Sequence, residues 1–332
     1  MDREQEEMQF LGLFGTYTES FKIIFTWRKI FGQITLALIF PLTLIFLAQM
    51  EISDILFSKI MRNEIQLEHT RAGTARYEKL SDMISSEMAY LWLFKFAYLI
   101  ILFVLSLLST AAVVYTIACI YTGRDVTFKK VISVVPGVWK RLMITFLSIF
   151  FCFLAYNFVA VVVLILWAVL IGPTKSGISV FYILLLFYSV VLVYMAIVWQ
   201  LASVVSVLED ACGFKAMIKS RALIKGKMWM ATVVFLKLSL SSAAIRIIFQ
   251  KLVVRGGSLG MVNRVSFGII CFLLIIKLFL FQLVIQTVIY FICKSYHHEN
   301  IDKSALSDHL EVYMGEYVPL KSKDVQLEHF EV

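Results

Sequence analysis

The chain has 332 residues, of which 60% are hydrophobic and 16% are charged, with a formal net charge of +8 and a mean hydropathy of +0.85. An ordinary globular domain is about 45–50% apolar and about 25% charged, so this composition excludes a pair of soluble domains. The 15 glycines and 4 prolines exclude collagen-like and low-complexity chains. The sequence therefore indicates a polytopic membrane protein.

Six continuous apolar runs are long enough to cross a bilayer, whose hydrocarbon core of about 30 Å needs about 20 helical residues. These runs cover residues 30–50, 96–122, 142–171, 176–208, 228–252 and 265–293. Pro41 lies inside the first run and predicts a kink there, because proline removes a helical hydrogen bond. The runs define a predicted six-helix transmembrane domain over residues 30–293.

Basic residues are concentrated in residues 1–29 and in the connections after the second and fourth runs. Connections rich in Lys and Arg stay on the cytosolic side of the membrane. We therefore expect both termini in the cytosol, with residues 1–29 and the acidic tail 294–332 on that side. Residues 51–94, which form all but the last residue of the connection between the first two runs, include five basic and seven acidic residues. The basic residues of this connection therefore weigh less in the assignment.

A Phe–Lys pair opens a short apolar and basic segment ahead of the first, third and fifth runs: Ser20–Ile24, Thr127–Ile132 and Gly213–Ile218. Such helices lie in the headgroup plane, with their rings at the acyl boundary and their cations toward anionic lipid. The alternative is that any cytosolic connection next to a membrane is basic and aromatic for topological reasons alone. The predicted fold class is all-α, a polytopic membrane bundle of six transmembrane helices and three cytosolic interfacial amphipathic helices. Its repeating unit is one interfacial helix followed by a transmembrane hairpin, and this unit occurs three times.

The lysines of the second and third segments are candidate ligands of anionic lipid headgroups. They are Lys129, Lys130, Lys215 and Lys219.

The connection between the fourth and fifth runs resembles part of a bacterial membrane module. Its residues Val205–Glu209, Ala216, Met217, Ser220, Arg221, Leu223, Gly226 and Trp229 are similar to a signature of the membrane domain associated with glycerophosphoryl diester phosphodiesterases. This resemblance implies a multi-helix bundle with amphipathic cytosolic helices. It does not imply the enzymatic activity, because no segment here could form the soluble (β/α) barrel of those enzymes.

The whole chain resembles an uncharacterised plant family of six-span transmembrane proteins, most closely at residues 296–308 and 315–321. Members of that family are often labelled as binding polyadenylate-binding protein. The tail lacks the Asn-Pro-centred peptide that such partners use, so its residues do not support that label.

Four basic residues lie within the apolar runs. Lys251 is next to the end of the fifth run, and the other three, Lys237, Arg246 and Lys277, are candidate anion-binding residues. No run contains an Asp or Glu that could pair with them. Ionisable groups at membrane depth are candidate functional residues. They could attract a lipid phosphate or an anionic substrate, which favours a transporter or channel. Alternatively, they reach the interface along their alkyl chains or bond to carbonyl groups in a packed bundle.

The sequence contains no phosphate-binding loop, nucleophile elbow, dinucleotide-binding glycine motif or zinc-ligand spacing. The five histidines lie outside the apolar runs, and we interpret Tyr296–Glu299 as a solvated segment rather than a metal site. We therefore expect no enzyme activity, no catalytic residue, no metal and no cofactor. The basic residues gather at membrane entry points rather than in one patch, so we expect no nucleic-acid partner.

The tail contains Tyr317 and Leu320 in a Tyr-x-x-apolar pattern, a candidate sorting motif that a trafficking adaptor or another cytosolic protein would read as an extended peptide. We expect a non-enzymatic, multi-pass protein of the endoplasmic reticulum, endomembranes or plasma membrane. It would engage anionic lipid headgroups and organise or accompany membrane cargo. The alternative is a transporter or channel for a small anion or lipid.

Overall fold

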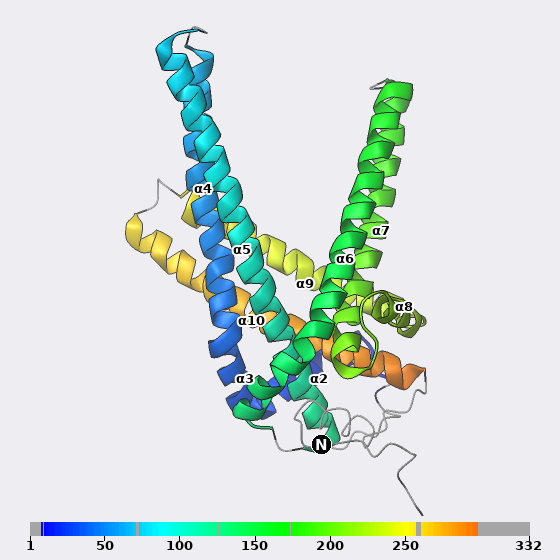
Figure 1. The fold of residues 1–332 in the computed structure, drawn as a ribbon. Helices are drawn as coiled ribbons and strands as arrows, with labels where there is room; N and C mark the ends of the chain where they lie inside the picture. Colours follow the sequence, from blue (N-terminus) through cyan, green and yellow to red (C-terminus); the bar gives the residue numbers. More distant parts are fainter. Residues whose placement is uncertain are drawn as a thin grey trace, which may run out of the picture. The chain divides into compact units, whose positions relative to one another are not determined.

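A computed structural model describes residues 8, 10–70, 73–124, 126–172, 174–256 and 260–297, and no β-strand occurs among them. Two π-helical segments interrupt or extend the helices, η1 (Thr35–Ile39) and η2 (Gln250–Val254). The α-helices are shown in Figure 1: α2 (Leu13–Thr26), α3 (Arg28–Ile34), α4 (Phe40–Glu68), α5 (Ala75–Thr122), α6 (Phe128–Leu170), α7 (Lys175–Leu208), α8 (Phe214–Leu223), α9 (Met228–Phe249) and α10 (Met261–Tyr296). The predicted all-α fold class is confirmed.

Six helical stretches of the described chain are long and apolar enough to cross a membrane, and each overlaps one predicted run. They are Arg28–Glu68, Ala75–Thr122, Phe128–Leu170, Ser176–Leu208, Met228–Val254 and Met261–Tyr296. The protein is therefore a multi-pass membrane protein.

The first span is not one regular α-helix. The π-helical segment η1 stands between α3 and α4, and Pro41 occupies the first turn of α4. Proline is tolerated in a first turn, because the N–H that it lacks has no intrahelical partner there. The hydrogen-bond register of the chain thus changes just before Pro41, whereas the kink itself stays a prediction.

The chain divides into two compact units. Unit 1 comprises Met1–Thr26, Thr110–Thr232 and Val284–Val332, and unit 2 comprises Trp27–Ser109 and Val233–Leu283. All three Phe–Lys segments belong to unit 1, whereas the four basic residues of the transmembrane runs belong to unit 2.

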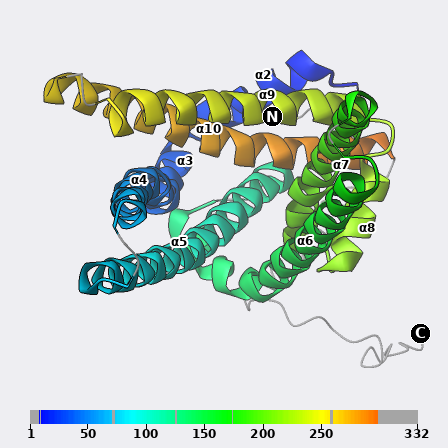
Figure 2. The same ribbon diagram turned by 90° about the horizontal axis from the view of Figure 1, so that it is seen from above.

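Unit 1 contains α2, the α6–α7 hairpin, α8 and the last turns of α10. Figures 1 and 2 show α6 and α7 side by side, with α8 beside one end of α7. The Tyr121 and Phe291 rings pack with their centroids 4.7 Å apart. The segment Thr127–Ile132 does not form a separate helix, because it is the capping residue and first turns of α6, which continues through Pro136.

Unit 2 is held by apolar packing and by ion pairs at one end. Leu47, Phe249, Cys271 and Ile275 form a buried cluster that joins α4, α9 and α10. Near this cluster, Arg255 pairs with Asp54 at 3.2 Å and Arg264 pairs with Glu51 at 3.5 Å.

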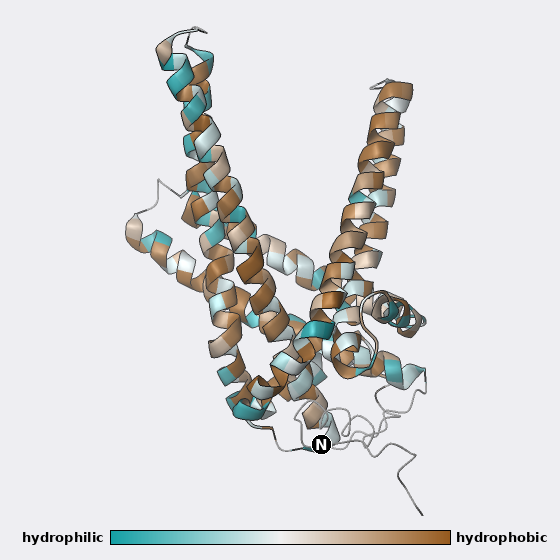
Figure 3. Ribbon diagram, in the orientation of Figure 1, coloured by the Kyte–Doolittle hydropathy of each residue, from teal (hydrophilic) through white to brown (hydrophobic). Residues whose placement is uncertain are grey.

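The connection between the first two spans is also helical, since α4 and α5 continue through it as a hairpin. Lys59 on α4 pairs with Glu87 on α5 at 2.9 Å, and Asn63 Nδ2 donates to Glu87 Oε2 at 2.8 Å. Figure 3 shows polar residues along this outer part of α4–α5. Hydropathy alone could not reveal the helices here, because it reports contact with lipid and not helix content.

Candidate functional site

One buried carboxylate joins three helices of unit 1. Glu209 is the first residue after α7, and its side chain is 10% exposed. It accepts hydrogen bonds from the Tyr290 hydroxyl at 2.5 Å and from Lys294 Nζ at 3.2 Å, both on α10. It also forms an ion pair with Lys219 on α8. Glu209 therefore ties the end of α7 to α8 and to α10.

The pKa of Glu209 reports the balance of forces at this junction. Burial alone would raise the pKa of the carboxyl group, but the hydrogen bonds from Lys219 and Tyr290 and the charges of Lys294 and Lys219 outweigh it. The pKa therefore lies below its ordinary value, and the carboxylate is ionised at neutral pH.

The N-terminal end of α8 is fixed against α6. Arg141 on α6 pairs with Asp210 at 2.6 Å, and the Gly213 amide donates to Thr145 Oγ1 at 2.9 Å. Gly213 has a φ of +61°, and a Cβ there would approach Ser148 Oγ to 3.1 Å. Glycine is suited to this position because a side chain would meet both backbone strain and crowding.

The C-terminal end of α8 is fixed against α10. His297 Nε2 lies 2.9 Å from the Leu223 carbonyl oxygen and 3.0 Å from that of Lys225. Carbonyl oxygens only accept, so Nε2 carries the proton and donates to both. The Tyr296 ring covers Gly226, whose φ is +88°, so tightly that a Cβ would overlap the ring. His297 is thus part of the attachment of α8, although the sequence analysis interprets its segment as solvated.

The middle of α8 is attached to α7. The Ser220 hydroxyl donates to the Val198 carbonyl oxygen at 2.7 Å, and Ala216, Ser220 and Leu223 form the buried face of the helix. Together with the contacts at both ends, this bond fixes which face of α8 points outward.

The outward face of α8 combines apolar side chains with cations. Phe214 is 58% exposed and Ile218 is 70% exposed, and between and beyond them lie exposed Lys215 and Arg221. Neither Lys215 nor Arg221 forms an ion pair with a described residue. Lys219, the fourth candidate lipid ligand of the sequence analysis, points instead to Glu209.

The helix α2 exposes rings and buries polar groups. Its exposed Phe14, Phe21 and Phe25 lie within about 40° of one another around the helix, given about 100° per residue. Its buried residues are Thr16, Glu19, Ser20 and Ile23. A helix at a water-exposed surface usually shows the opposite arrangement.

The second Phe–Lys segment presents its cations at the start of α6. Lys129 and Lys130 are exposed in the first turn of that helix and form no ion pair with any residue that the structure describes. Of the four lysines predicted as headgroup ligands, Lys129, Lys130 and Lys215 are thus open to an external anion.

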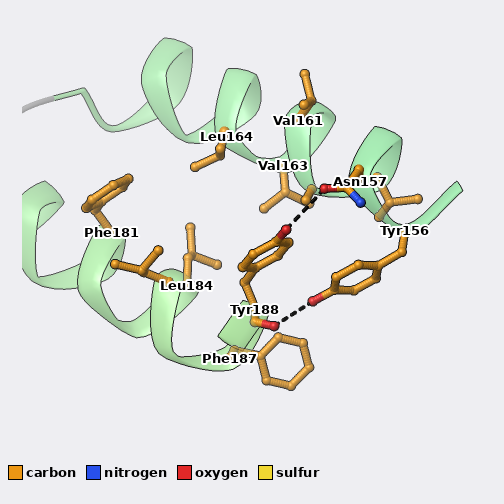
Figure 4. Close-up of a pocket in the computed structure, with 12 residues that line it drawn as sticks. Tyr156, Asn157, Val161, Val163, Leu164, Phe181, Leu184, Phe187 and Tyr188 are labelled. Atoms are coloured by element: carbon orange, nitrogen blue, oxygen red, sulfur yellow. Dashed lines mark hydrogen bonds between the residues drawn. The ribbon is translucent and has the colours of Figure 1, made fainter. Parts of the chain in front are cut away.

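A pocket of about 380 Å³ lies between α6 and α7 (Figure 4). At its polar end the Tyr156 hydroxyl donates to the Tyr188 carbonyl oxygen at 2.8 Å, and the Tyr188 hydroxyl donates to Asn157 Oδ1 at 3.1 Å. The two tyrosine rings stack with centroids 5.2 Å apart. Because these polar groups already form hydrogen bonds with one another, we interpret them as contacts that hold α6 against α7 rather than as a ligand site.

The basic residues of the transmembrane runs lie in unit 2. Lys237 and Arg246 on α9 and Lys277 on α10 are all exposed, and none forms an ion pair within the described residues. The candidate sorting residues Tyr317 and Leu320 lie outside the described residues, and so does most of the tail.

The sequence analysis predicts none of the contacts that fix α8, although Glu209, Ser220 and Gly226 belong to the signature of the bacterial membrane module. Glu209 follows directly on an uncharged span, and Tyr290 and Lys294 are four residues apart at the end of the last span. The acidic pair Glu209-Asp210 at one span end and Lys294 at the end of another span are the signal that could have suggested this pairing.

The profile of a family described as a domain of unknown function, DUF8558, matches residues 1–330. The chain belongs to this family. The match includes both units, Glu209 and its partners, and all three Phe–Lys segments. No curated protein and no solved structure matches the chain.

Proposed function

We propose that this multi-pass protein is non-enzymatic and engages anionic lipid on the cytosolic surface of an endomembrane or the plasma membrane. The three Phe–Lys segments of unit 1 would make the contact and thereby organise or accompany membrane cargo. The single observation that carries the proposal is that α8 is fixed at both ends and at its middle with Phe214, Lys215, Ile218 and Arg221 turned outward.

The sorting of charges in unit 1 supports this role. The inward-facing cations around α8 have carboxylate partners within the chain: Arg141 pairs with Asp210, and Lys219 and Lys294 pair with Glu209. The outward-facing Lys215 and Arg221 have none among the described residues. An external anionic surface is the partner that this arrangement lacks, and each basic residue near such a surface adds about 1 kcal/mol of attraction.

The exposed rings also support this role. Phe21 is 48% exposed on α2 next to Lys22, and Trp229 is 77% exposed at the start of α9, two residues after Lys227. Aromatic side chains beside cations are typical of the membrane interface, where rings enter the acyl boundary and cations remain among the headgroups. This combination distinguishes a lipid-facing surface from a solvated basic loop.

The alternative of a transporter or channel requires Lys237, Arg246 and Lys277 to line a common path. The structure leaves each of these side chains exposed. The geometry therefore supports the lipid-engaging role better.

The test is to reconstitute the full-length protein in nanodiscs of phosphatidylcholine with a minority of phosphatidylserine. Mass spectrometry of the lipids that remain after mild detergent exchange gives the enrichment of phosphatidylserine. Lys225 is an exposed cation just after α8, on the same part of the chain as Lys215. We expect Lys215→Ser with Lys225→Ser to lower this enrichment by about fivefold per lysine, since each contributes about 1 kcal/mol.

The matched control removes two exposed cations from α5 near the tip of the α4–α5 hairpin, Arg76→Ser with Lys79→Ser. This variant should retain the phosphatidylserine enrichment of the wild type. Equal enrichment in the wild type and in the Lys215/Lys225 variant would overturn the proposed function.

A further inference from the structure

A second pocket, a groove of about 230 Å³, lies between α7 and α8. Tyr194, Val198 and Trp199 contribute to the α7 wall, and Phe214 and Ile218 contribute to the α8 wall. Arg221 is the single charged residue of the lining. The groove therefore combines apolar walls with one cation.

Arg221 lies in the last turn of α8, is exposed, and forms no ion pair with a described residue. The carboxylates beside α8 are engaged elsewhere, since Glu209 holds Lys219 and Lys294 and Asp210 holds Arg141. A guanidinium group matches the oxygens of a phosphate bidentately, which makes arginine well suited to a phosphate at an interface.

Trp199 adds a second unsatisfied group to the groove. Its Nε1 atom is buried and has no hydrogen-bond acceptor among the described residues. A buried donor without an acceptor costs about 1–3 kcal/mol. An ester oxygen of a lipid bound in the groove is an acceptor of the kind that this donor lacks.

The volume of the groove suits one segment of an acyl chain. A water molecule occupies about 30 Å³ in the liquid and a methylene group is of similar size, so about 230 Å³ holds about eight chain carbons. The rest of the chain would continue along the exposed apolar surface of α7, where Leu186 and Val190 are exposed.

We propose that this groove is a binding site for one anionic phospholipid, with a segment of an acyl chain between α7 and α8 and its phosphate on Arg221. This inference rests on the proposed function, because it requires α8 to lie at a membrane surface. It adds a site of defined stoichiometry to a general electrostatic attraction.

The test is native mass spectrometry of the full-length protein in detergent, titrated with phosphatidylserine. We expect one molecule to bind more tightly than the rest. Arg221→Gln should weaken this binding by at least about tenfold, as expected for the loss of a charged hydrogen-bond pair. Met195→Trp, which enlarges a side chain of the groove lining, should also abolish it while leaving every cation in place.

A matched control places the same bulky ring away from the groove. Val169→Trp changes an exposed residue of α6 that lies outside the Phe–Lys segments and does not line the groove, and it should leave the tight molecule bound. Unchanged stoichiometry and affinity in both Arg221→Gln and Met195→Trp would overturn the inference.

Two further results separate this inference from the proposed function. If Met195→Trp loses the tight molecule but keeps the nanodisc enrichment of phosphatidylserine, both proposals stand. If the Lys215/Lys225 variant loses enrichment while no variant alters a tight molecule, the function stands and the groove proposal fails. Inorganic phosphate that binds as tightly as phosphatidylserine would identify a phosphate site and likewise overturn the lipid proposal.

Discussion

The hairpins α4–α5, most of which belongs to unit 2, and α6–α7 of unit 1 both have helices longer than a bilayer crossing requires. The two hairpins differ in the residues that make up the excess length. Their helices have 29, 48, 43 and 34 residues, whereas about 20 suffice to cross the hydrocarbon. Beyond residue 50, α4–α5 becomes polar and carries the Lys59–Glu87 ion pair, whereas α6–α7 remains hydrophobic to its tip (Figure 3).

The difference teaches that helix length alone does not say where a helix ends relative to the membrane. Residues 51–68 of α4 add about 27 Å at 1.5 Å per residue, and their polar composition lets them project into water. The apolar part of α6, residues 142–170, is about 44 Å long. None of the residues in the most apolar stretch of α6 is buried in the protein, whereas 44% of those in the most apolar stretch of the first span are buried. That hairpin must tilt or find apolar cover for its excess length.

The largest expected effect separates the two hairpins directly. Leu186 on α7 and Ile65 on α4 are both exposed, but we expect lipid around the first and water around the second. Leu186→Arg should cost about 3 kcal/mol of insertion free energy, because an arginine at membrane depth is poorly solvated. Ile65→Arg should cost close to nothing. The measurement is the apparent insertion free energy of each hairpin in a translocation assay, and equal costs would remove the contrast.

The next effect compares two partly buried acids, Glu209 and Glu87. Glu209→Gln should lower the free energy of unfolding at neutral pH by about 2 kcal/mol, because Lys219 and Lys294 lose their carboxylate while partly buried. Glu87→Gln on α5 removes a pair whose lysine is 61% exposed and should cost less than about 1 kcal/mol. Thermal unfolding in the same detergent measures both variants.

The pH dependence of stability tests whether Glu209 stabilises the protein through its ionised form. The pKa of Glu209 is lowered in the folded protein from its ordinary value of 4.5. Its stabilising contribution is therefore fully present above about pH 4.5 and is lost as the pH falls through the lower folded pKa. The difference between wild type and Glu209→Gln should shrink in that acidic range, and a difference that does not change with pH would contradict the ion-pair account.

The smallest expected effect compares two glycines. Gly226→Ala should destabilise the protein by about 1–2 kcal/mol, because its φ is +88° and Tyr296 occupies the space of a Cβ. Gly32 lies in α3 with nothing within 4 Å of a Cβ, so Gly32→Ala should be neutral or stabilise by up to about 1 kcal/mol. Thermal unfolding of the two variants should therefore give shifts of opposite or very unequal size.

Much of the transmembrane fold follows from hydropathy. The predicted ends at residues 122 and 208 and the start at residue 228 coincide with the bounds of α5, α7 and α9, because a charged or glycine-containing connection stops both apolar composition and helix there. The outer parts of α4 and α5 could not be found in this way. They are polar helices held by Lys59, Asn63 and Glu87, and their pairing depends on contacts between residues far apart in the sequence.

The candidate site follows from the sequence only in part. The Phe–Lys pattern locates α2 and α8, and it finds the exposed Lys215. It could not distinguish Lys215 from Lys219, four residues along the same helix, because only the fold shows that Glu209 takes the second one. It also treats Thr127–Ile132 as equivalent to the other two segments, although the helix there runs without interruption into α6.

The contacts of Glu209 have a consequence for the order in which the protein is assembled. Tyr290 and Lys294 follow Glu209 by 81 and 85 residues, so a growing chain completes α7 and α8 long before these two partners leave the ribosome. Until then Lys219 alone faces the carboxylate, and the His297 contacts that fix the end of α8 are missing as well. The helix α8 thus reaches its final position only after the last transmembrane segment has been made. The correct placement of α8 is therefore a late step in biogenesis.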